Sequence, residues 1–375
     1  MEVNKGNRTM KICFVTATLT SGGSERVMSL VANQLAVRGH EVEIVNLNKH
    51  IVFYPIHQNV HLSFAEDEVG SSIIRKICWL RKHIKKEKPD VVIPFMEAVF
   101  CVTLLALIGV KVPVISSERI DPRKSPFIRN ILRRIFLPLT THLVVQTQDI
   151  KDFYPKFIQK RTSIIYNPVS ETVFHLQEEP KENTIISVGK LDGQKNQKLL
   201  INAFASIAED FPEWKLVIYG EGRERDSLES LIKSLSPTLP RKEGVLNGYE
   251  NSISNRILLP GRCETVIEEM NKAKVFAFSS DFEGMSNAIL EAVSIGLPVV
   301  TTNVSGAAEL VKDGEGGFVV PIRDGKALAD SLKILLKDES LIQKMARHNK
   351  ATAKNYKLDM IVDQWESLIL QICKH

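Results

Sequence analysis

Short apolar runs alternate with helical segments along almost the whole chain, and this alternation restricts the possible folds more than any other feature. In the first half, the helical segment Glu25–Val37 ends at Gly39, a residue typical of a helix C-cap. Strands that alternate with helices in this way predict an α/β fold built on a doubly wound parallel sheet. We expect strands at Lys11–Ala17, Glu41–Val45, Asp90–Ile93, Val112–Ile115 and His142–Val145.

A second series of strands and helices begins after Ser163–Val169, past a polar linker marked by Pro168 and Gln177–Asn183. Its expected strands are Thr184–Val188, Lys215–Tyr219, Arg256–Leu259, Val275–Phe278, Pro298–Thr301 and Gly317–Val320. A chain of 375 residues is long enough for two domains. We therefore predict two Rossmann-like domains, residues 10–167 and 183–356, facing each other across a cleft at the carboxyl ends of their strands.

Two further segments complete the predicted organisation. The C-terminal helix, residues 359–373, has one apolar side and is expected to pack back onto the first domain. Ser236–Ser254 is rich in proline, glycine, asparagine and charge, and is predicted to be a long loop.

The composition excludes several classes of protein. With 44% apolar and 25% charged residues, the chain can build a core and is not disordered overall. Its longest uncharged apolar run, Ala98–Val110, has 13 residues, whereas a membrane span needs about 20. Met1–Thr9 has no apolar signal-peptide core, so we expect a cytoplasmic protein. The five cysteines form no C-x-x-C pair, which argues against a disulfide framework or a zinc site.

The net positive charge of the chain comes from its first half. Residues 1–177 contain 24 Lys and Arg against 15 Asp and Glu, a net +9, whereas residues 178–375 contain 25 against 29, a net −4. Two predicted amphipathic helices, residues 71–88 and Ser125–Leu137, hold many of these charges. They could contact anionic lipid headgroups and a lipid diphosphate, or simply be domain helices with solvated faces. Nucleic acid is disfavoured because aromatic residues do not alternate with the charges. The candidate acceptor and membrane residues are Arg75, Lys76, Lys82, Lys86, Arg129 and Arg133.

Two glutamates flank the start of a predicted helix in Asp281–Glu291. Glu283 and Glu291 are eight residues apart, and eight helical residues rise about 12 Å and turn about 800°, which returns to nearly the same side. The free N–H groups of a helix start can hold an anion. Here they belong to Met285, Ser286 and Asn287. The pattern suits a phosphate between two hydroxyl-bearing rings, although a solvated helix face has the same spacing.

Two glycine-containing loops follow strands and precede helices. Gly189 permits a close approach of the backbone to a ligand, and Lys190 and Lys195 after it could neutralise a pyrophosphate. Gly22 and Gly23 form a turn at the start of the first helix. They lack the third glycine of the dinucleotide motif G-x-G-x-x-G, which argues against a nicotinamide dehydrogenase.

Taken together and in order, these motifs resemble those of the retaining glycosyltransferases of family 4, which have the GT-B fold. The matching segments are Ser21–Arg26, Ser117–Arg119, Tyr166–Val169, Gly189–Asn196, Gly220–Gly222, Pro260–Arg262, Glu283–Glu291, Ile295–Val300 and the stretch from Gly314 to Gly317. Within the family the chain looks most like the PglH-type N-acetylgalactosaminyltransferases, which act on polyprenyl-diphosphate-linked glycans. The resemblance covers residues 10 to 370.

The resemblance implies a role for each matching residue. Lys190 and Lys195 would stabilise the departing nucleotide diphosphate, and Glu283 would hold the hydroxyls of the donor sugar. Glu291 would bind the ribose, and the amides of Met285, Ser286 and Asn287 would face the sugar and the diphosphate. Gly261, Arg262 and Val266 would lie beside the uracil. Gly22 and Gly23 would approach the donor phosphates or the acceptor.

Three features depart from the family pattern. Arg119 stands where close relatives often have histidine; it can serve a phosphate or sugar oxygen but cannot act as a general base at neutral pH. Lys190 replaces the usual arginine, keeping the charge but losing the bidentate fork. The loop at residues 236–254 is an addition.

The implied reaction is a front-side displacement in which the leaving phosphate takes the acceptor proton. The chain has no Asp-x-Asp metal clamp, so we expect neither a metal nor a cofactor. The expected partners are a nucleotide sugar, which we expect to be UDP-linked, a lipid-linked glycan and the inner face of an anionic membrane. Two alternatives stay open: an acceptor-independent UDP-sugar 2-epimerase of the same fold, and a non-catalytic membrane-docking module.

Overall fold

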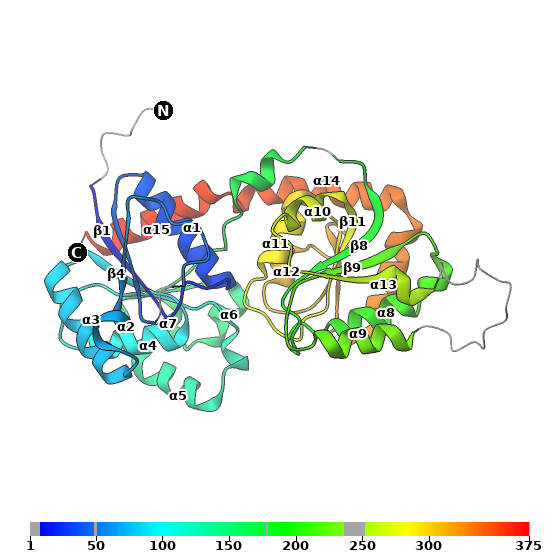
Figure 1. Cartoon of the computed structure of the whole chain (residues 1–375). Helices are drawn as coiled ribbons and strands as arrows, with labels where there is room; N and C mark the ends of the chain where they lie inside the picture. Colours follow the sequence, from blue (N-terminus) through cyan, green and yellow to red (C-terminus); the bar gives the residue numbers. More distant parts are fainter. Residues whose placement is uncertain (1–7, 49–50, 178, 236–251, 375) are drawn as a thin grey trace. The chain divides into compact units, whose positions relative to one another are not determined.

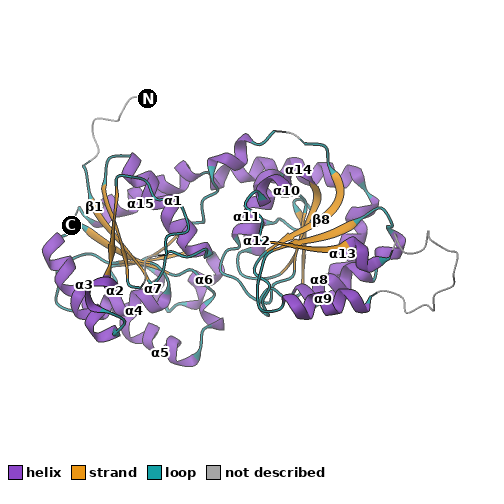
Figure 2. Ribbon diagram, in the orientation of Figure 1, coloured by secondary structure: helices purple, strands orange, loops and turns teal. Residues whose placement is uncertain are grey.

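The computed structural model describes residues 8–48, 51–177, 179–235 and 252–374. These residues form two compact units, and each unit is a parallel sheet with helices on both faces (Figures 1 and 2). Unit 1 comprises Met1–Pro168 and Tyr356–His375, and unit 2 comprises Val169–Asn355. Residues 236–251 of the predicted loop lie outside the described residues.

Unit 1 has a four-stranded sheet of order β3-β2-β1-β4 and a three-stranded sheet of order β5-β6-β7. Parallel bridges from Val92 to Val114 and from Phe95 to Ser117 connect β4 to β5. The strands are β1 (Lys11–Thr16), β2 (Glu41–Asn46), β3 (Val60–Phe64), β4 (Val91–Pro94), β5 (Ile115–Ser117), β6 (His142–Val145) and β7 (Thr162–Ile164).

Helices on the two faces of this sheet bury separate clusters of apolar side chains. On one face α1 packs against the C-terminal helix α15, whose Trp365 is fully buried. On the other face α3 packs against α4, α2 packs against α3, and α5 packs against α4. The helices of unit 1 are α1 (Gly23–Val37), α2 (Ala65–Val69), α3 (Ile73–Glu87), α4 (Glu97–Ala106), α5 (Phe127–Phe136), α6 (Gln148–Phe153), α7 (Lys156–Gln159) and α15 (Leu358–Ile372).

Unit 2 has a six-stranded sheet of order β10-β9-β8-β11-β12-β13. Helices α8, α9 and α13 cover one face, and α10, α11 and α14 cover the other (Figure 1). The strands are β8 (Glu182–Val188), β9 (Lys215–Tyr219), β10 (Ile257–Gly261), β11 (Ala273–Phe278), β12 (Val299–Thr302) and β13 (Gly317–Val320). The helices are α8 (Gln197–Ala205), α9 (Arg225–Ser234), α10 (Val266–Lys272), α11 (Asn287–Ile295), α12 (Ala307–Leu310), α13 (Gly325–Lys337) and α14 (Glu339–Ala353).

The α/β prediction is confirmed, with differences at particular strands. The structure begins β5 at Ile115, where the predicted strand Val112–Ile115 ends. Pro113 has no N–H, and its carbonyl instead accepts a hydrogen bond from the backbone N–H of Val92. Sequence analysis did not identify β3, in which polar residues alternate with apolar ones, or β7, which has three residues.

Candidate functional site

The order of strands in unit 2 reverses direction between β8 and β11. The chain runs from β8 outward to β9 and β10, and then returns to β11 on the other side of β8. In open α/β sheets such a switch point leaves a crevice at the carboxyl ends of the two strands, where ligands bind. The loop after β8 contains Gly189–Asn196, and the loop after β11 contains Ser279–Ser286, so the predicted donor residues flank this point.

Lys195 and Glu283 meet at the switch point. The Nζ of Lys195 is 2.5 Å from Oε1 of Glu283, and the hydroxyl of Ser280 donates to the same oxygen at 2.8 Å. The ammonium also lies 5.0 Å from the centre of the Phe278 ring. Since both charged side chains are largely buried, each neutralises the other in a partly desolvated place.

The aliphatic stem of this lysine lies beside Gly189. A Cβ at Gly189 would lie 3.6 Å from Cδ and Cε of Lys195, so the aliphatic stem lies directly over the glycine backbone. Lys190, by contrast, is exposed, and its carbonyl accepts from Nε2 of Gln197. Of the two lysines, Lys195 alone forms an ion pair with Glu283 among the residues described.

Helix α11 begins at Asn287, four residues after Glu283. Ser286 is its N-cap, and the hydroxyl of Ser286 accepts from the N–H of Ile289 at 3.4 Å. Met285, Ser286 and Glu291 are buried, while Asn287 is half-buried. The structure therefore places the start of a buried nine-residue helix beside the Lys195–Glu283 pair.

Glycines hold the neighbouring loops of unit 2 in backbone contact. A Cβ at Gly220 would lie 1.9 Å from the carbonyl oxygen of Gly189, and one at Gly222 would lie 2.0 Å from that of Leu191. Gly261 ends β10 at a φ of 92°, and its carbonyl accepts from the N–H of Gly220. The Gly-Glu-Gly segment is therefore required for the tight packing of the loops.

Two predicted donor residues follow this packed region. Arg262 is exposed, directly after Gly261, and Val266 begins α10 in a half-buried position. They follow β10, the outermost strand of the unit 2 sheet, and Gly189 follows β8 of the same sheet.

In unit 1, a carboxylate lies at the predicted glycine turn. Gly22 is the N-cap of α1, Gly23 is its first residue, and Oε2 of Glu25 would be 2.2 Å from a Cβ at Gly22. Thr18 and Ser24 donate hydrogen bonds to this carboxylate. A phosphate can reach the Gly22 turn only after the side chain of Glu25 moves aside, because like charges repel.

Arg119 lies near the carboxyl end of β5 and is 7% exposed. Its guanidinium carbon is 4.5 Å from the centre of the Phe95 ring and 5.7 Å from that of Trp365, and its Nη1 donates to Oδ1 of Asn167. Nε and Nη2 have no hydrogen-bond partner among the described residues. Burial lowers the pKa of Arg119 to about 9. Sequence analysis did not identify the aromatic partners, because Trp365 comes from the far end of the chain.

The structure corrects the prediction for two of the basic residues. Lys76 is buried in α3 and donates to Oδ1 of Asn48 and Oε2 of Glu66, both at 2.7 Å. Arg133 is 2% exposed, and its Nε donates to Oε2 of Glu118 at 2.9 Å. Neither can contact a lipid headgroup from these positions, because each cation neutralises an acid of its own unit.

The remaining basic residues are exposed, although two of them line a cavity. Arg75, Lys82, Lys86 and Arg129 are exposed. Lys82 and Lys86 line a cavity of about 670 Å³ between α3 and the sheet of unit 1, together with Glu41 and Glu43. None of the predicted donor residues lines this cavity.

Helix α5 has its apolar side toward solvent. Phe127, Ile128 and Ile135 are 81%, 69% and 58% exposed, whereas Arg133 points inward. Tyr154 donates to the same Glu118 oxygen that Arg133 binds. Burial raises the pKa of Glu118, and the adjacent Arg133 opposes this effect. The helix is therefore attached to unit 1 by a buried polar cluster rather than by its apolar stripe.

Two negative findings concern membranes and metals. Within the described ranges, no helix combines the length and the apolar character that a bilayer crossing requires. In the same ranges, no three side chains of His, Cys, Asp or Glu are grouped as a metal ion would need.

Both units match known protein families. Residues 21–173 match the family described as Glycosyltransferase Family 4, and residues 182–338 match Glycosyl transferases group 1. A Campylobacter jejuni protein is 30% identical, over 97% of this chain and 99% of its own. Its name is GalNAc-alpha-(1->4)-GalNAc-alpha-(1->3)-diNAcBac-PP-undecaprenol alpha-1,4-N-acetyl-D-galactosaminyltransferase. A second Campylobacter jejuni protein, an N-acetylgalactosamine-N,N'-diacetylbacillosaminyl-diphospho-undecaprenol 4-alpha-N-acetylgalactosaminyltransferase, is 28% identical over 94% and 96% of the two chains.

Solved structures share the fold. Anabaena HepE in complex with UDP superposes with a TM-score of 0.77 at 18% identity, covering 96% of this chain and all of that one. Sucrose-phosphate synthase from Thermosynechococcus elongatus reaches 0.80 at 14% identity, covering 96% and 98%.

Proposed function

The chain belongs to glycosyltransferase family 4 and has the GT-B fold, and from this premise we propose that it transfers an N-acetylhexosamine or hexose from a UDP-sugar to a polyprenyl-diphosphate-linked glycan. The observation that carries the proposal is the meeting of Lys195 and Glu283 at the switch point beside the start of α11. The names of the two Campylobacter relatives support the acceptor, and the UDP complex of HepE supports the nucleotide.

We propose that the reaction retains the anomeric configuration and needs no metal. The bond from the sugar C1 to the diphosphate oxygen breaks, a bond from C1 to the acceptor oxygen forms on the same face, and the acceptor proton passes to the departing diphosphate. Lys195, exposed Lys190 and the N-terminus of α11 stabilise the developing charge. Glu283 accepts hydrogen bonds from the sugar hydroxyls, and Glu291 binds the ribose.

We assign the remaining predicted residues to ligand groups from their positions in the fold. Gly261, Arg262 and Val266 lie at the edge of the same sheet and would border the uracil. Arg119 would bind an acceptor phosphate or sugar oxygen through Nε and Nη2, its two nitrogens without a hydrogen-bond partner among the described residues.

We further propose that unit 1 binds the inner face of an anionic membrane through α5. Its apolar residues Phe127, Ile128 and Ile135 are exposed, with the exposed cations Arg129 and Arg134 on the same helix. Such a helix lies in the interface with its apolar side among the acyl chains. This location brings the enzyme to a lipid-linked acceptor.

Released UDP tests the enzymatic proposal. The protein is incubated with UDP-GalNAc, UDP-GlcNAc or UDP-glucose and an undecaprenyl-diphosphate-linked glycan, with and without EDTA. We expect UDP release that requires the acceptor, persists in EDTA, gives an α-linked product, and falls by about 100-fold or more in Glu283→Gln and Lys195→Ala. Exposed Glu213→Gln is the matched control. Absence of release with every donor refutes the transferase assignment, and sugar isomerisation without acceptor favours an epimerase.

Vesicle flotation tests the membrane proposal. The wild type should float with vesicles containing phosphatidylglycerol, and Phe127→Glu with Ile128→Glu should reduce the bound fraction. Ile334→Glu, at an apolar residue of unit 2 that is 49% exposed, is the control. Equal binding of all three proteins contradicts the role of α5.

A further inference from the structure

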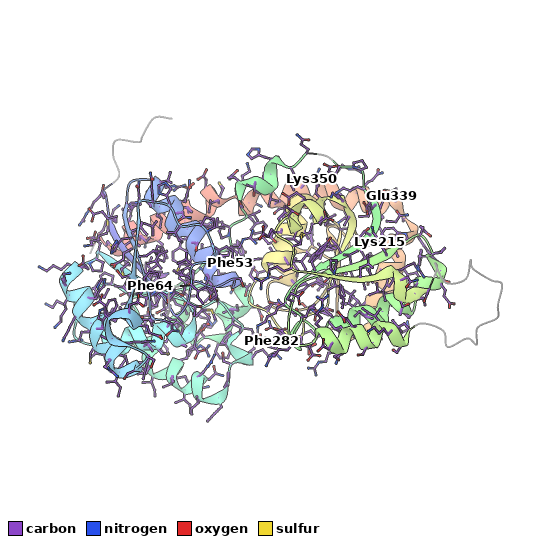
Figure 3. All side chains as sticks on the ribbon, in the orientation of Figure 1. Phe53, Phe64, Lys215, Phe282, Glu339 and Lys350 are labelled. Carbon is purple, nitrogen blue, oxygen red and sulfur yellow. The ribbon has the colours of Figure 1, made fainter. Side chains whose placement is uncertain are left out.

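Two loops that are more than eighty residues apart in sequence are joined around Lys195. The backbone N–H of Asp281 donates to the carbonyl of Gln194 at 2.8 Å, and Nε2 of Gln194 donates to the carbonyl of Phe282 at 2.8 Å. The hydroxyl of Ser279 donates to the carbonyls of Lys195 and Asn196, both at 3.0 Å. Figure 3 labels Phe282, the residue that separates Asp281 from Glu283.

Asp281 holds the residues on both sides of Lys195. Its N–H binds Gln194, which precedes the lysine, and its Oδ1 accepts from Nδ2 of Asn196, which follows it, at 3.0 Å. Glu283 is two residues further along the same loop as Asp281. The backbone N–H of Asp281 thus holds the residue before Lys195, and its carboxylate holds the residue after it, two positions from Glu283.

The two residues that bind this carboxylate both have unusual backbone conformations. Asn196 has a φ of 48° and Arg323 a φ of 65°, and among described residues only Lys88 and Met96 share this property outside glycine. Nε and Nη2 of Arg323 donate to Oδ2 of Asp281 at 2.8 and 2.6 Å. Backbone of this kind persists where the surrounding contacts enforce it, and it is concentrated at functional sites.

We propose that Asp281 is a positioning residue of the donor site. It keeps the side chains of Lys195 and Glu283 at a fixed position relative to each other, and Asn196 and Arg323 hold its carboxylate in place. The proposal rests on the donor roles proposed above for Lys195 and Glu283. Stability alone does not explain the Arg323 contact, because the arginine side chain is 74% exposed and exposed ion pairs contribute little to folding. Positional accuracy does explain it, since a displacement of about 1 Å can reduce a rate by about 100-fold.

Steady-state kinetics of the full chain test the proposal, with released UDP as the readout. Asp281→Ala should lower kcat/KM for the UDP-sugar by about 10- to 100-fold and weaken UDP binding in calorimetry, with little change in melting temperature. Asp281→Asn, which keeps an oxygen for Asn196, should lose less. Arg323→Ala should lose less than Asp281→Ala, and the double variant should be no worse than Asp281→Ala alone, because Arg323 acts through the carboxylate.

Asp330→Ala is the matched control, because Asp330 forms an exposed ion pair with Lys326 in the neighbouring α13. It should retain full activity. The proposal is overturned if Asp281→Ala keeps wild-type kcat/KM, or if both Asp281 variants lose activity only in proportion to unfolded protein. Failure of the proposed function gives a different result: no UDP release from the wild type, or full activity in Lys195→Ala.

Discussion

At the scale of single residues, the site depends on contacts that two short loops make possible. The residue types that sequence analysis assigned to the donor site, Lys195 and Glu283, do meet, because both follow neighbouring strands of one parallel sheet. Lys190 does not join them, since its side chain is exposed. Motif spacing predicts which loop a residue belongs to but not the direction in which its side chain points.

Gly220 gives the sharpest prediction about backbone packing. Gly220→Ala should destabilise the protein by about 3 kcal/mol, because its Cβ would lie 1.9 Å from the carbonyl oxygen of Gly189 at a φ of 145°. Gly193→Ala, where a Cβ meets nothing within 4 Å, should change stability by less than about 0.5 kcal/mol. Urea unfolding of both variants measures the difference; equal values would show that the Gly189 loop can move away.

Arg119 should give the reaction a basic limit. Burial lowers its pKa from 12.5 to about 9, so the guanidinium loses its charge, and its attraction for a phosphate, as pH rises through about 9. Between pH 9 and 12 the unfolded chain binds more protons at this residue than the folded chain, so this group stabilises folding increasingly as pH rises. A fall in activity above pH 9 therefore cannot come from Arg119 destabilising the fold.

The pH profile of kcat/KM for the acceptor, measured from pH 7 to 10, checks this prediction. The wild type should lose activity near pH 9. Arg119→Gln should be less active at pH 7 and lack that decline. A decline of the same size in the variant would assign it to another group.

At the scale of elements, α5 shows what helical periodicity does and does not reveal. The sequence correctly separates an apolar stripe from a basic one, but in the structure the apolar residues are exposed and Arg133 is buried. The partner that draws Arg133 inward, Glu118, lies on a different element, so no pattern within the helix could identify it. Lys76 is buried for the same reason, by Glu66 of α2.

Arg133 should therefore contribute to stability rather than to lipid binding. Arg133→Met should destabilise unit 1 by about 3 to 5 kcal/mol, because it leaves the buried carboxylate of Glu118 without its cation. Arg134→Met, at the exposed neighbour, should change stability by less than about 0.5 kcal/mol. Chemical denaturation compares them, and adding Glu118→Gln should restore part of the loss. Equal stability of the two arginine variants would contradict this assignment.

At the scale of the whole molecule, the alternation of strands and helices was enough to predict two parallel α/β units. The exact edges of the sheets were less predictable, because β7 has only three residues and Pro113 displaces the start of β5. The alternation of polar and apolar residues in β3 is typical of a half-buried strand, and sequence analysis missed it. Apart from Gly22 and Gly23, the proposed donor residues belong to unit 2, which has its own hydrophobic cluster, whereas unit 1 has two others.

Separate cores predict separate responses to the nucleotide. In calorimetry, UDP at about 100 times its Kd should stabilise unit 2 by about 2.7 kcal/mol and raise its unfolding temperature more than that of unit 1. Lys195→Ala should reduce the shift. The unfolding of unit 1 is identified from the near-ultraviolet signal that is lost when Trp365→Phe is compared with the wild type. A UDP-induced rise in unfolding temperature confined to unit 1 would place the nucleotide outside unit 2.

Helix α15, at the end of the chain, supplies Trp365 to the surface on which Arg119 rests. During synthesis the ribosome releases Val169–Asn355 as one continuous stretch, but Tyr356–His375, the last part of unit 1, emerges only after unit 2 has been made. Unit 2, which is encoded second, can therefore complete its fold first, and the contact between Arg119 and Trp365 forms only after unit 2 is complete.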